Sequence, residues 1–186
     1  GMSTGPHLCP SGRSCLVYSQ NDTSDQTALT GGAWFVDPQR PSQRVDLSKP
    51  VDGTGPVVSM KVDATGRYVL FTQGVGGDDA EHLHWADLAA EEAPRVVEVT
   101  DFSVANYNFG IAPDGGHFWR KAAGTGRVAI APIDAPTELT SVDDSDGMQF
   151  NQSGIRFGSG GKWAYHGSTV TPDNSMPVYD VLWRVD

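Results

Sequence analysis

The stretch Ile111-Ala-Pro-Asp-Gly-Gly-His-Phe-Trp-Arg120 predicts a strand, a tight turn and a second strand. Glycine adopts positive φ without penalty, and an Asp before it hydrogen-bonds its own backbone, so Pro-Asp-Gly favours a hairpin turn. Residues 8–17, 62–71 and 157–166 carry weaker copies of the same pattern. The copies are spaced by 54, 49 and 46 residues, measured between the turn glycines Gly12, Gly66, Gly115 and Gly161. A period of this size is typical of propeller blades, solenoids or arrays.

Each copy is expected to begin a unit of four strands. In the second copy, Val58, Met60 and Val62 alternate with polar residues as in a half-buried strand, and residues 68–75 form a more continuously apolar strand. Further strands are predicted over residues 82–88 and 95–100 in this unit, and over 3–9, 32–37 and 43–47 in the first. In the third unit they are predicted over residues 107–111, 117–122, 126–131 and 137–140, and in the last over 178–186. The last unit therefore lacks its outer strand. No helix is predicted, because the best candidate, residues 86–92, is short and precedes Pro94.

Two further landmarks recur in the aligned copies. The innermost strand carries an apolar residue at the same place in three copies, which predicts a constant inward face: Met60, Phe109 and Ile155. An Asp follows the third strand in every copy: Asp37, Asp87, Asp134 and Asp186. Insertions in repeat proteins fall in loops, while the stacked faces keep matching. The sequence thus predicts one domain of four repeats, over residues 3–50, 51–101, 102–145 and 146–186.

The composition favours an all-β chain and argues against nucleic-acid or membrane binding. The 22 Gly and 12 Pro in 186 residues exceed average usage, as many short strands joined by turns require. With 13 Lys and Arg against 23 Asp and Glu, the net charge is -10, so nucleic-acid phosphates or an anionic membrane would be repelled. Neither a transmembrane span nor a signal peptide is expected. Gly1 before the first Met is typical of a scar from tag removal, and an extracytoplasmic location stays an alternative if the chain was trimmed.

Cys9 and Cys15 flank the first turn. Pairing across this turn brings them close enough for a disulfide, although a diagonal bridge across a tight hairpin is geometrically demanding. Zinc needs more ligands than these two cysteines, and the nearby His7 has no second histidine at finger spacing. The pair is therefore a disulfide candidate and no zinc site is predicted here.

His82 and His84 fall on the same side of one predicted strand, after Asp78 and Asp79 in the preceding loop. Two such histidines could ligate a metal or act as acid and base. The alternative interpretation is that both are simply solvated on an exposed strand.

Asp143, Asp144 and Asp146 gather hard oxygen ligands beside Gly147, which is a weak candidate for a calcium site. The segment does not match EF-hand spacing, and an acidic solvent loop is the alternative. Ser159 lies between glycines but fails the Gly-x-Ser-x-Gly pattern, and its place at the repeat turn favours a hairpin. No catalytic residue is assigned, and calcium is the one cofactor considered.

The pattern of a strand, a Pro-Asp-Gly turn, an apolar strand and a strand ending in Asp resembles the β-propeller repeats of the TolB-like and WD-repeat-like class. It is best preserved at Ile111-Ala-Pro-Asp-Gly115, and in part at Val62-Asp-Ala-Thr-Gly66, Cys9-Pro-Ser-Gly12 and Gly158-Ser-Gly-Gly161. The Gly-His and Trp-Asp signatures of a true WD repeat do not accompany it. The resemblance implies radially arranged blades and a binding role. We therefore expect an all-β, propeller-like fold of about four blades of four antiparallel strands, with the last blade incomplete.

The sequence favours a non-enzymatic platform that binds a protein or peptide through loops. The alternatives are a hydrolase, or the accessory propeller domain of one, acting on a peptide or glycan, and a carbohydrate- or calcium-binding module. A hydrolase predicts carboxylates and histidines converging in a deep pocket, whereas a platform predicts a shallow rim. The open edge of the last blade could be completed by a second copy, giving a homo-oligomer.

Overall fold

The computed structural model describes residues 7–8, 16–22, 30–37, 42–75, 81–89, 94–99, 104–122, 128–141, 156–157, 164–170 and 179–185. These residues form strands, turns and one short 3-10 helix, η1 (Lys49–Val51), which begins with a proline in its first turn. The predicted all-β class is confirmed. Within the described ranges no helix is long and apolar enough to cross a membrane.

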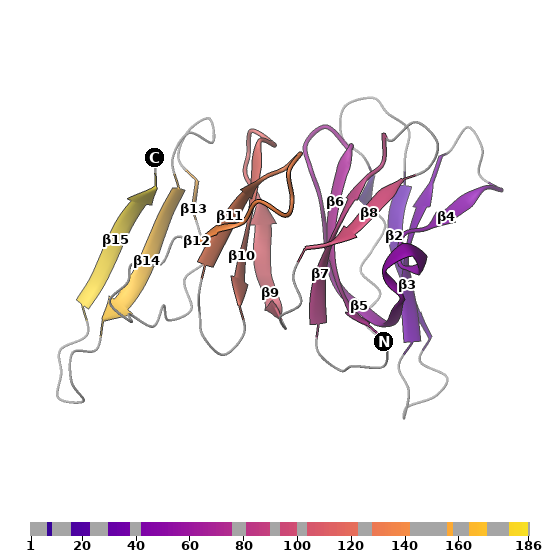
Figure 1. Ribbon diagram of the computed structural model, residues 1–186, viewed down its shortest axis with the longest axis horizontal. Coiled ribbons are helices and arrows are strands. Elements are labelled where there is room, and N and C mark those ends of the chain that lie inside the picture. The colour runs from indigo at the N-terminus through magenta and orange to yellow at the C-terminus, as the bar shows by residue number, and fades with distance from the viewer. Residues whose placement is uncertain are drawn as a thin grey trace. The chain divides into compact units, whose positions relative to one another are not determined.

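The strands form four antiparallel sheets, in each of which neighbours in space are neighbours in sequence (Figure 1). The first sheet contains β1 (His7–Leu8), β2 (Leu16–Asp22), β3 (Thr30–Val36) and β4 (Arg44–Asp46). The second contains β5 (Gly53–Val62), β6 (Tyr68–Val75), β7 (Glu81–Asp87) and β8 (Arg95–Glu98). The third contains β9 (Val104–Ile111), β10 (His117–Ala122), β11 (Val128–Pro132) and β12 (Thr140–Ser141). The fourth contains β13 (Arg156–Phe157), β14 (Ala164–Val170) and β15 (Tyr179–Val185). Blades of four strands, with a last blade of three described strands, are thus confirmed.

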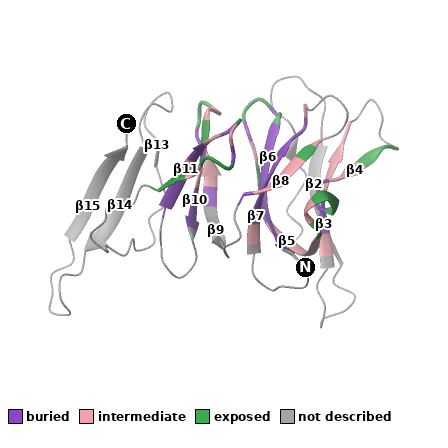
Figure 2. Cartoon of the chain, in the orientation of Figure 1, coloured by how far each residue is buried: buried purple, intermediate pink, exposed green. Residues whose placement is uncertain are grey.

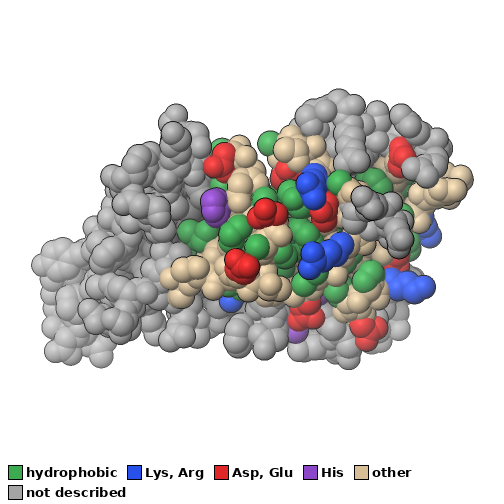
Figure 3. Space-filling model, turned by 45° about the horizontal axis from the view of Figure 1, so that its top comes forward, with side chains coloured by type: hydrophobic (Ala, Val, Ile, Leu, Met, Phe, Trp, Pro, Cys, Tyr) green, Lys and Arg blue, Asp and Glu red, His purple; other side chains and the backbone are tan. Residues whose placement is uncertain are grey.

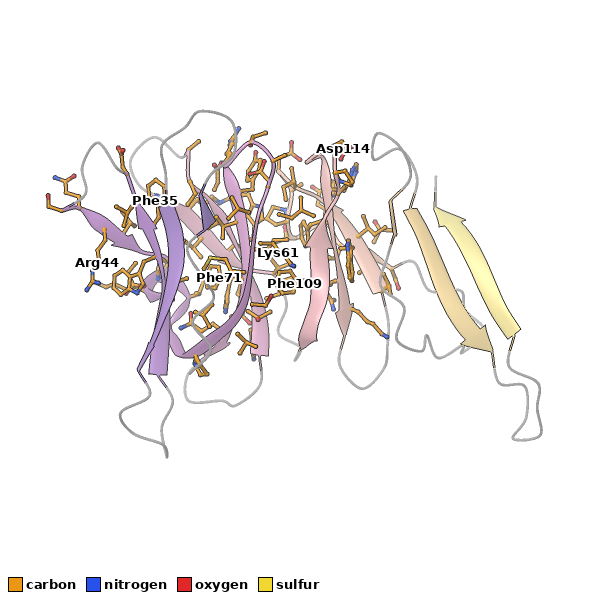
Figure 4. The ribbon with its side chains drawn as sticks, turned by 180° about the vertical axis from the view of Figure 1, so that it is seen from behind. Phe35, Arg44, Lys61, Phe71, Phe109 and Asp114 are labelled. Atoms are coloured by element: carbon orange, nitrogen blue, oxygen red, sulfur yellow. The ribbon has the colours of Figure 1, made fainter. Side chains whose placement is uncertain are left out.

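The chain divides into two compact units, Gly1–Tyr107 and Asn108–Asp186. In the first unit, apolar side chains from β3 and the end of β4 pack against the second sheet: Ala33, Leu47, Val57, Met60, Val69, Phe71, Ala86 and Leu88. Phe35 of β3 also packs against this cluster. Figure 4 labels Phe35 and Phe71, which is one of the cluster's members. Burial of this apolar surface is the main force that joins the two sheets, and the middle strands of the second sheet are largely buried (Figure 2).

The innermost strands of two sheets carry the predicted inward face. Met60 on β5 is 3% exposed and Phe109 on β9 is 2% exposed. In the second unit, Phe109 is joined by further buried apolar side chains: Ala112, Phe118, Val128, Ala129, Ala131 and Ile133. The prediction is confirmed for these two positions, while Ile155 lies outside the described residues.

The β5–β6 and β9–β10 turns have the same backbone geometry. Gly66 and Gly115 have φ of 72° and 70°. Each donates its N–H to the carbonyl three residues earlier, at 3.0 Å to Asp63 and 2.9 Å to Ala112. These two glycines therefore occupy equivalent turns, as their alignment predicts. Glycine is favoured at both positions because L side chains rarely adopt this conformation. Gly12 and Gly161 lie outside the described residues.

The prediction that an Asp follows the third strand in every copy is only partly correct. Cross-strand pairing places Val36, Ala86 and Ala131 at equivalent positions of β3, β7 and β11. Asp37 and Asp87 follow the first two of these directly, whereas Pro132 takes their place on β11. Asp134 lies two residues beyond Pro132. The β10–β11 hairpin is shorter than the β6–β7 hairpin, so the position equivalent to Asp87 comes earlier in the third copy than the alignment predicts.

Candidate functional site

The turn between β5 and β6 is built around a buried carboxylate. Asp63 is 1% exposed, and its Oδ1 accepts the Tyr68 N–H at 2.7 Å. Its Oδ2 accepts the Thr65 N–H at 3.0 Å and also the Thr65 hydroxyl. Hydrogen bonds to a carboxylate are stronger than neutral ones, so the turn and the first residues of β6 are held in one conformation.

This turn presents Arg67, whose side chain is fixed from two sides. Its Nε donates to Asp87 Oδ1 at 2.9 Å and its Nη2 to Oδ2 at 2.7 Å, and its Cζ lies 4.7 Å from the centre of the Tyr68 ring. The Arg67 side chain is 48% exposed and that of Asp87 12%. The hydrogen bond to Asp87 raises the pKa of Arg67, and the same bond lowers the pKa of the Asp87 carboxyl. The pair therefore stays charged, and the guanidinium is positioned but accessible.

Arg95 at the start of β8 is a second exposed cation at this end of the sheet. Its Cζ lies 5.8 Å from the centre of the Trp85 ring, and its backbone is paired with that of Asp87. We call the exposed surface formed by Ala64, Thr65, Arg67 and Arg95 the hairpin-end surface. Figure 3 shows that the described residues present both cationic and acidic side chains on the face of the molecule that is turned forward.

His84, one of the predicted metal or acid–base candidates, is fully buried on β7. Its ring lies 5.0 Å from that of Phe71, and its Nε2 donates to the Gln73 carbonyl at 3.4 Å. Its Nδ1 has no hydrogen-bond partner among the described residues. Burial lowers the pKa of His84 to about 4. The ring is therefore a neutral member of the core.

His82 lies on the same face of β7, as the sequence predicts, because it pairs with Gln73 while His84 pairs with Phe71. Its Nδ1 donates to Glu98 Oε1 at 2.6 Å, and its side chain is 13% exposed. Neither histidine has the solvated position that the alternative interpretation expected, since both side chains are largely covered.

No group of three metal-ligating side chains is found among the described residues. The calcium candidates Asp143, Asp144 and Asp146 lie outside these residues, as do the disulfide candidates Cys9 and Cys15. Those assignments remain predictions. The loop residues Asp78 and Asp79, and Ser159 at the last turn, also lie outside the described residues.

Sequence reasoning missed the Arg67–Asp87 pair, although two aligned landmarks contain it. A basic residue directly follows the turn glycine in three copies: Arg13, Arg67 and Lys162. The same three copies carry the Asp at the equivalent end of the third strand: Asp37, Asp87 and Asp186. The third copy has neither, with Gly116 after its turn glycine and Pro132 at the end of β11. Reading the two landmarks together would have identified the Arg67–Asp87 ion pair.

Comparison with known proteins extends this description. No family model matches the chain, and no curated protein matches its sequence. Among solved structures, TolB from Acinetobacter baumannii aligns over 97% of this chain and 40% of its own, with 13% identity and a TM-score of 0.52. The tricorn protease aligns over 96% of this chain and 16% of its own, with 11% identity and a TM-score of 0.61.

A third similar structure is the β-propeller domain of Cps50 (Swd1) from Myceliophteria thermophila. It aligns over 97% of this chain and 56% of its own, with 14% identity and a TM-score of 0.50. The chain thus spans less than two thirds of the length of each of these three structures. At these identities the likeness concerns the fold alone. Four successive antiparallel sheets, equivalent blade-opening turns and these neighbours together show that the chain has an incomplete β-propeller fold of the TolB-like and WD-repeat-like type.

Proposed function

We propose that the chain is a non-enzymatic binding module that engages a protein or peptide through the hairpin ends of its blades. The observation that carries the proposal is Arg67, whose guanidinium is held by two bonds to Asp87 and is nonetheless half exposed. Binding normally costs side-chain entropy, and a side chain that is already fixed loses less of it. Arg is also enriched at the centres of protein interfaces.

The chemistry of the hairpin-end surface favours a ligand with carboxylate or carbonyl oxygens. A guanidinium has five N–H donors and no acceptor, and the bonds from Arg67 to Asp87 are made by Nε and Nη2. The neighbouring Arg95 adds a second cation. A basic residue also stands at the equivalent sequence position of two other copies, Arg13 and Lys162. An acidic peptide segment fits this set of groups.

A displayed library of random peptides provides the probe, because no ligand is identified. Peptides selected on the immobilised chain are synthesised, and their affinity is measured by fluorescence polarisation. We expect acidic peptides to be enriched. We also expect the Arg67→Ala/Arg95→Ala double variant to bind them at least about tenfold more weakly, a loss of about 1.4 kcal/mol or more.

Lys49→Glu is the matched control. Lys49 is exposed on η1, before the first residue of β5, whereas the β5–β6 turn follows the last residue of that strand. The change to Glu should leave peptide affinity within about twofold, since local contacts rather than net charge carry the binding. The proposal is wrong if no peptide is enriched, or if the double variant binds the selected peptides as tightly as the parent chain does. Cleavage of the selected peptides would instead favour a hydrolase.

A further inference from the structure

The edge of the fourth sheet differs from the edges of the other three. The outermost strands of the first three sheets are short, with three residues in β4, four in β8 and two in β12. In the fourth sheet the last strand is β15, which has seven residues and pairs along its whole length with β14. Among the described residues, no strand pairs with the other side of β15. Long unpaired edges are templates for pairing with another chain.

The sequence of β15 is complementary to itself when two copies run antiparallel. Opposed residues of neighbouring strands lie on the same face of a sheet. A two-fold axis normal to the sheet therefore pairs even-numbered residues with even-numbered ones, and odd-numbered residues with odd-numbered ones. With the axis at Leu182, Asp180 of each copy falls opposite Arg184 of the other. In the same register Val181 falls opposite Trp183, and Tyr179 falls opposite Val185. Opposite-charge and aromatic–β-branched pairs are the cross-strand combinations that stabilise sheets.

Neighbouring registers lose this complementarity. Centring the axis on Val181 places Asp180 opposite Leu182, and centring it on Trp183 places Arg184 opposite Leu182. Both leave a charged residue opposite an apolar one. The Leu182-centred register is therefore the one in which both charges of β15 are opposed by their complements.

We propose that two copies of this chain join through β15, antiparallel and centred on Leu182, into one continuous six-stranded sheet. The contact is isologous, so each strand supplies both an Asp180 and an Arg184 to it. The two residues are four positions apart on one strand, about 13 Å along its axis, so they do not form this pair within a single copy. A partner of different sequence at this edge is the competing occupant, and the experiments below distinguish it.

Charge exchange tests the pairing. Sedimentation velocity of the full chain over a range of concentrations should show a dimer. Arg184→Asp alone, and Asp180→Arg alone, should each weaken self-association by about tenfold or more, because each opposes like charges twice. An equimolar mixture of the two single variants should associate again, since each copy then opposes the other with complementary charges at both pairs. Circular dichroism verifies that each single variant is folded.

Cross-linking tests the register independently of these variants. In a background with both native cysteines replaced by Ser, Leu182→Cys places two thiols at directly opposed positions, within disulfide range. Mild oxidation should give a covalent dimer. Val181→Cys is the matched control, because its two copies lie diagonally, about 8 Å apart, beyond that range. A parent chain that stays monomeric, a mixture of single variants that stays monomeric, or equal cross-linking of the two Cys variants would overturn the proposal.

Discussion

Acidification should destabilise the first unit through one buried histidine. His84 is fully buried, its Nε2 faces a carbonyl that can only accept a hydrogen bond, and its Nδ1 has no hydrogen-bond partner in the described part of the chain. A second ring proton on Nδ1 would therefore be buried without an acceptor. This geometry accounts for the fall in the pKa of His84 from 6.5 to about 4, of which desolvation is the largest cause.

The direction and size of the effect follow from this pKa. Because the folded value lies below the unfolded one, the stability that His84 contributes is fully present above pH 6.5 and is lost as the pH falls toward 4. A shift of one pKa unit corresponds to about 1.4 kcal/mol, so the complete loss is about 3 kcal/mol. About 2 kcal/mol of it should already be lost at pH 5.

The assay is urea unfolding, monitored by tryptophan fluorescence at several pH values between 4 and 8, for the parent chain and for His84→Leu. Leu has no titrating group, so the free energy of unfolding of the variant should fall less steeply between pH 6.5 and 4. All other titratable groups are present in both proteins, so their contribution cancels in the difference between the two profiles. Parallel pH profiles, or an NMR titration that places the pKa of His84 near 6.5, would refute this reasoning.

Three further predictions concern the blade-opening turns. Asp63→Ala should lower the free energy of unfolding by about 2–4 kcal/mol in urea titrations, because the Tyr68 N–H and a second turn donor lose their acceptor. Gly115→Ala and Gly66→Ala should each cost about 1–2 kcal/mol, measured by thermal unfolding, since both positions have φ near 70°, whereas Asn should cost less. Arg67→Ala should change the free energy of unfolding by less than about 1 kcal/mol while weakening peptide binding, because a half-exposed ion pair contributes little to stability. A larger loss of stability in that variant would assign Arg67 a structural role instead.

The blade-opening turns could be predicted because their cause is local. Gly66 and Gly115 adopt a conformation that few other residues tolerate, and the residues beside them alternate as in strands. The predicted equivalence of Asp134 with Asp87 was wrong because its cause is not local. It depends on the register of β10 with β11, which is set by a loop whose length varies freely between the blades.

The environment of His84 could not be predicted from β7 itself. Its sequence is Glu-His-Leu-His-Trp-Ala-Asp, and residues 82–85 alternate polar and apolar as in a half-exposed strand. In the structure Leu83, His84 and Trp85 are all buried, so both faces of the strand are covered. Coverage of the second face depends on residues outside this strand, and no pattern within seven residues encodes it.

The first sheet shows what a fourth strand contributes, and this bears on the pairing proposed for β15. Trp34 on β3 is opposed by Asp46 on β4, and Arg44, two residues before Asp46, lies with its Cζ 4.1 Å from the centre of the Trp34 ring. Cross-strand pairing places Trp183 of β15 at the position equivalent to Trp34.

In the Leu182-centred dimer, Val181 of the second copy opposes Trp183, and the residue two positions before it is Tyr179. Diagonal neighbours of this kind are within reach of aromatic side chains. The second copy would thus bring an aromatic residue to the register position that Arg44 fills in the first sheet. The same pairing that opposes Asp180 with Arg184 would therefore also place an aromatic residue at that register position, which a strand of unrelated sequence would do only by chance.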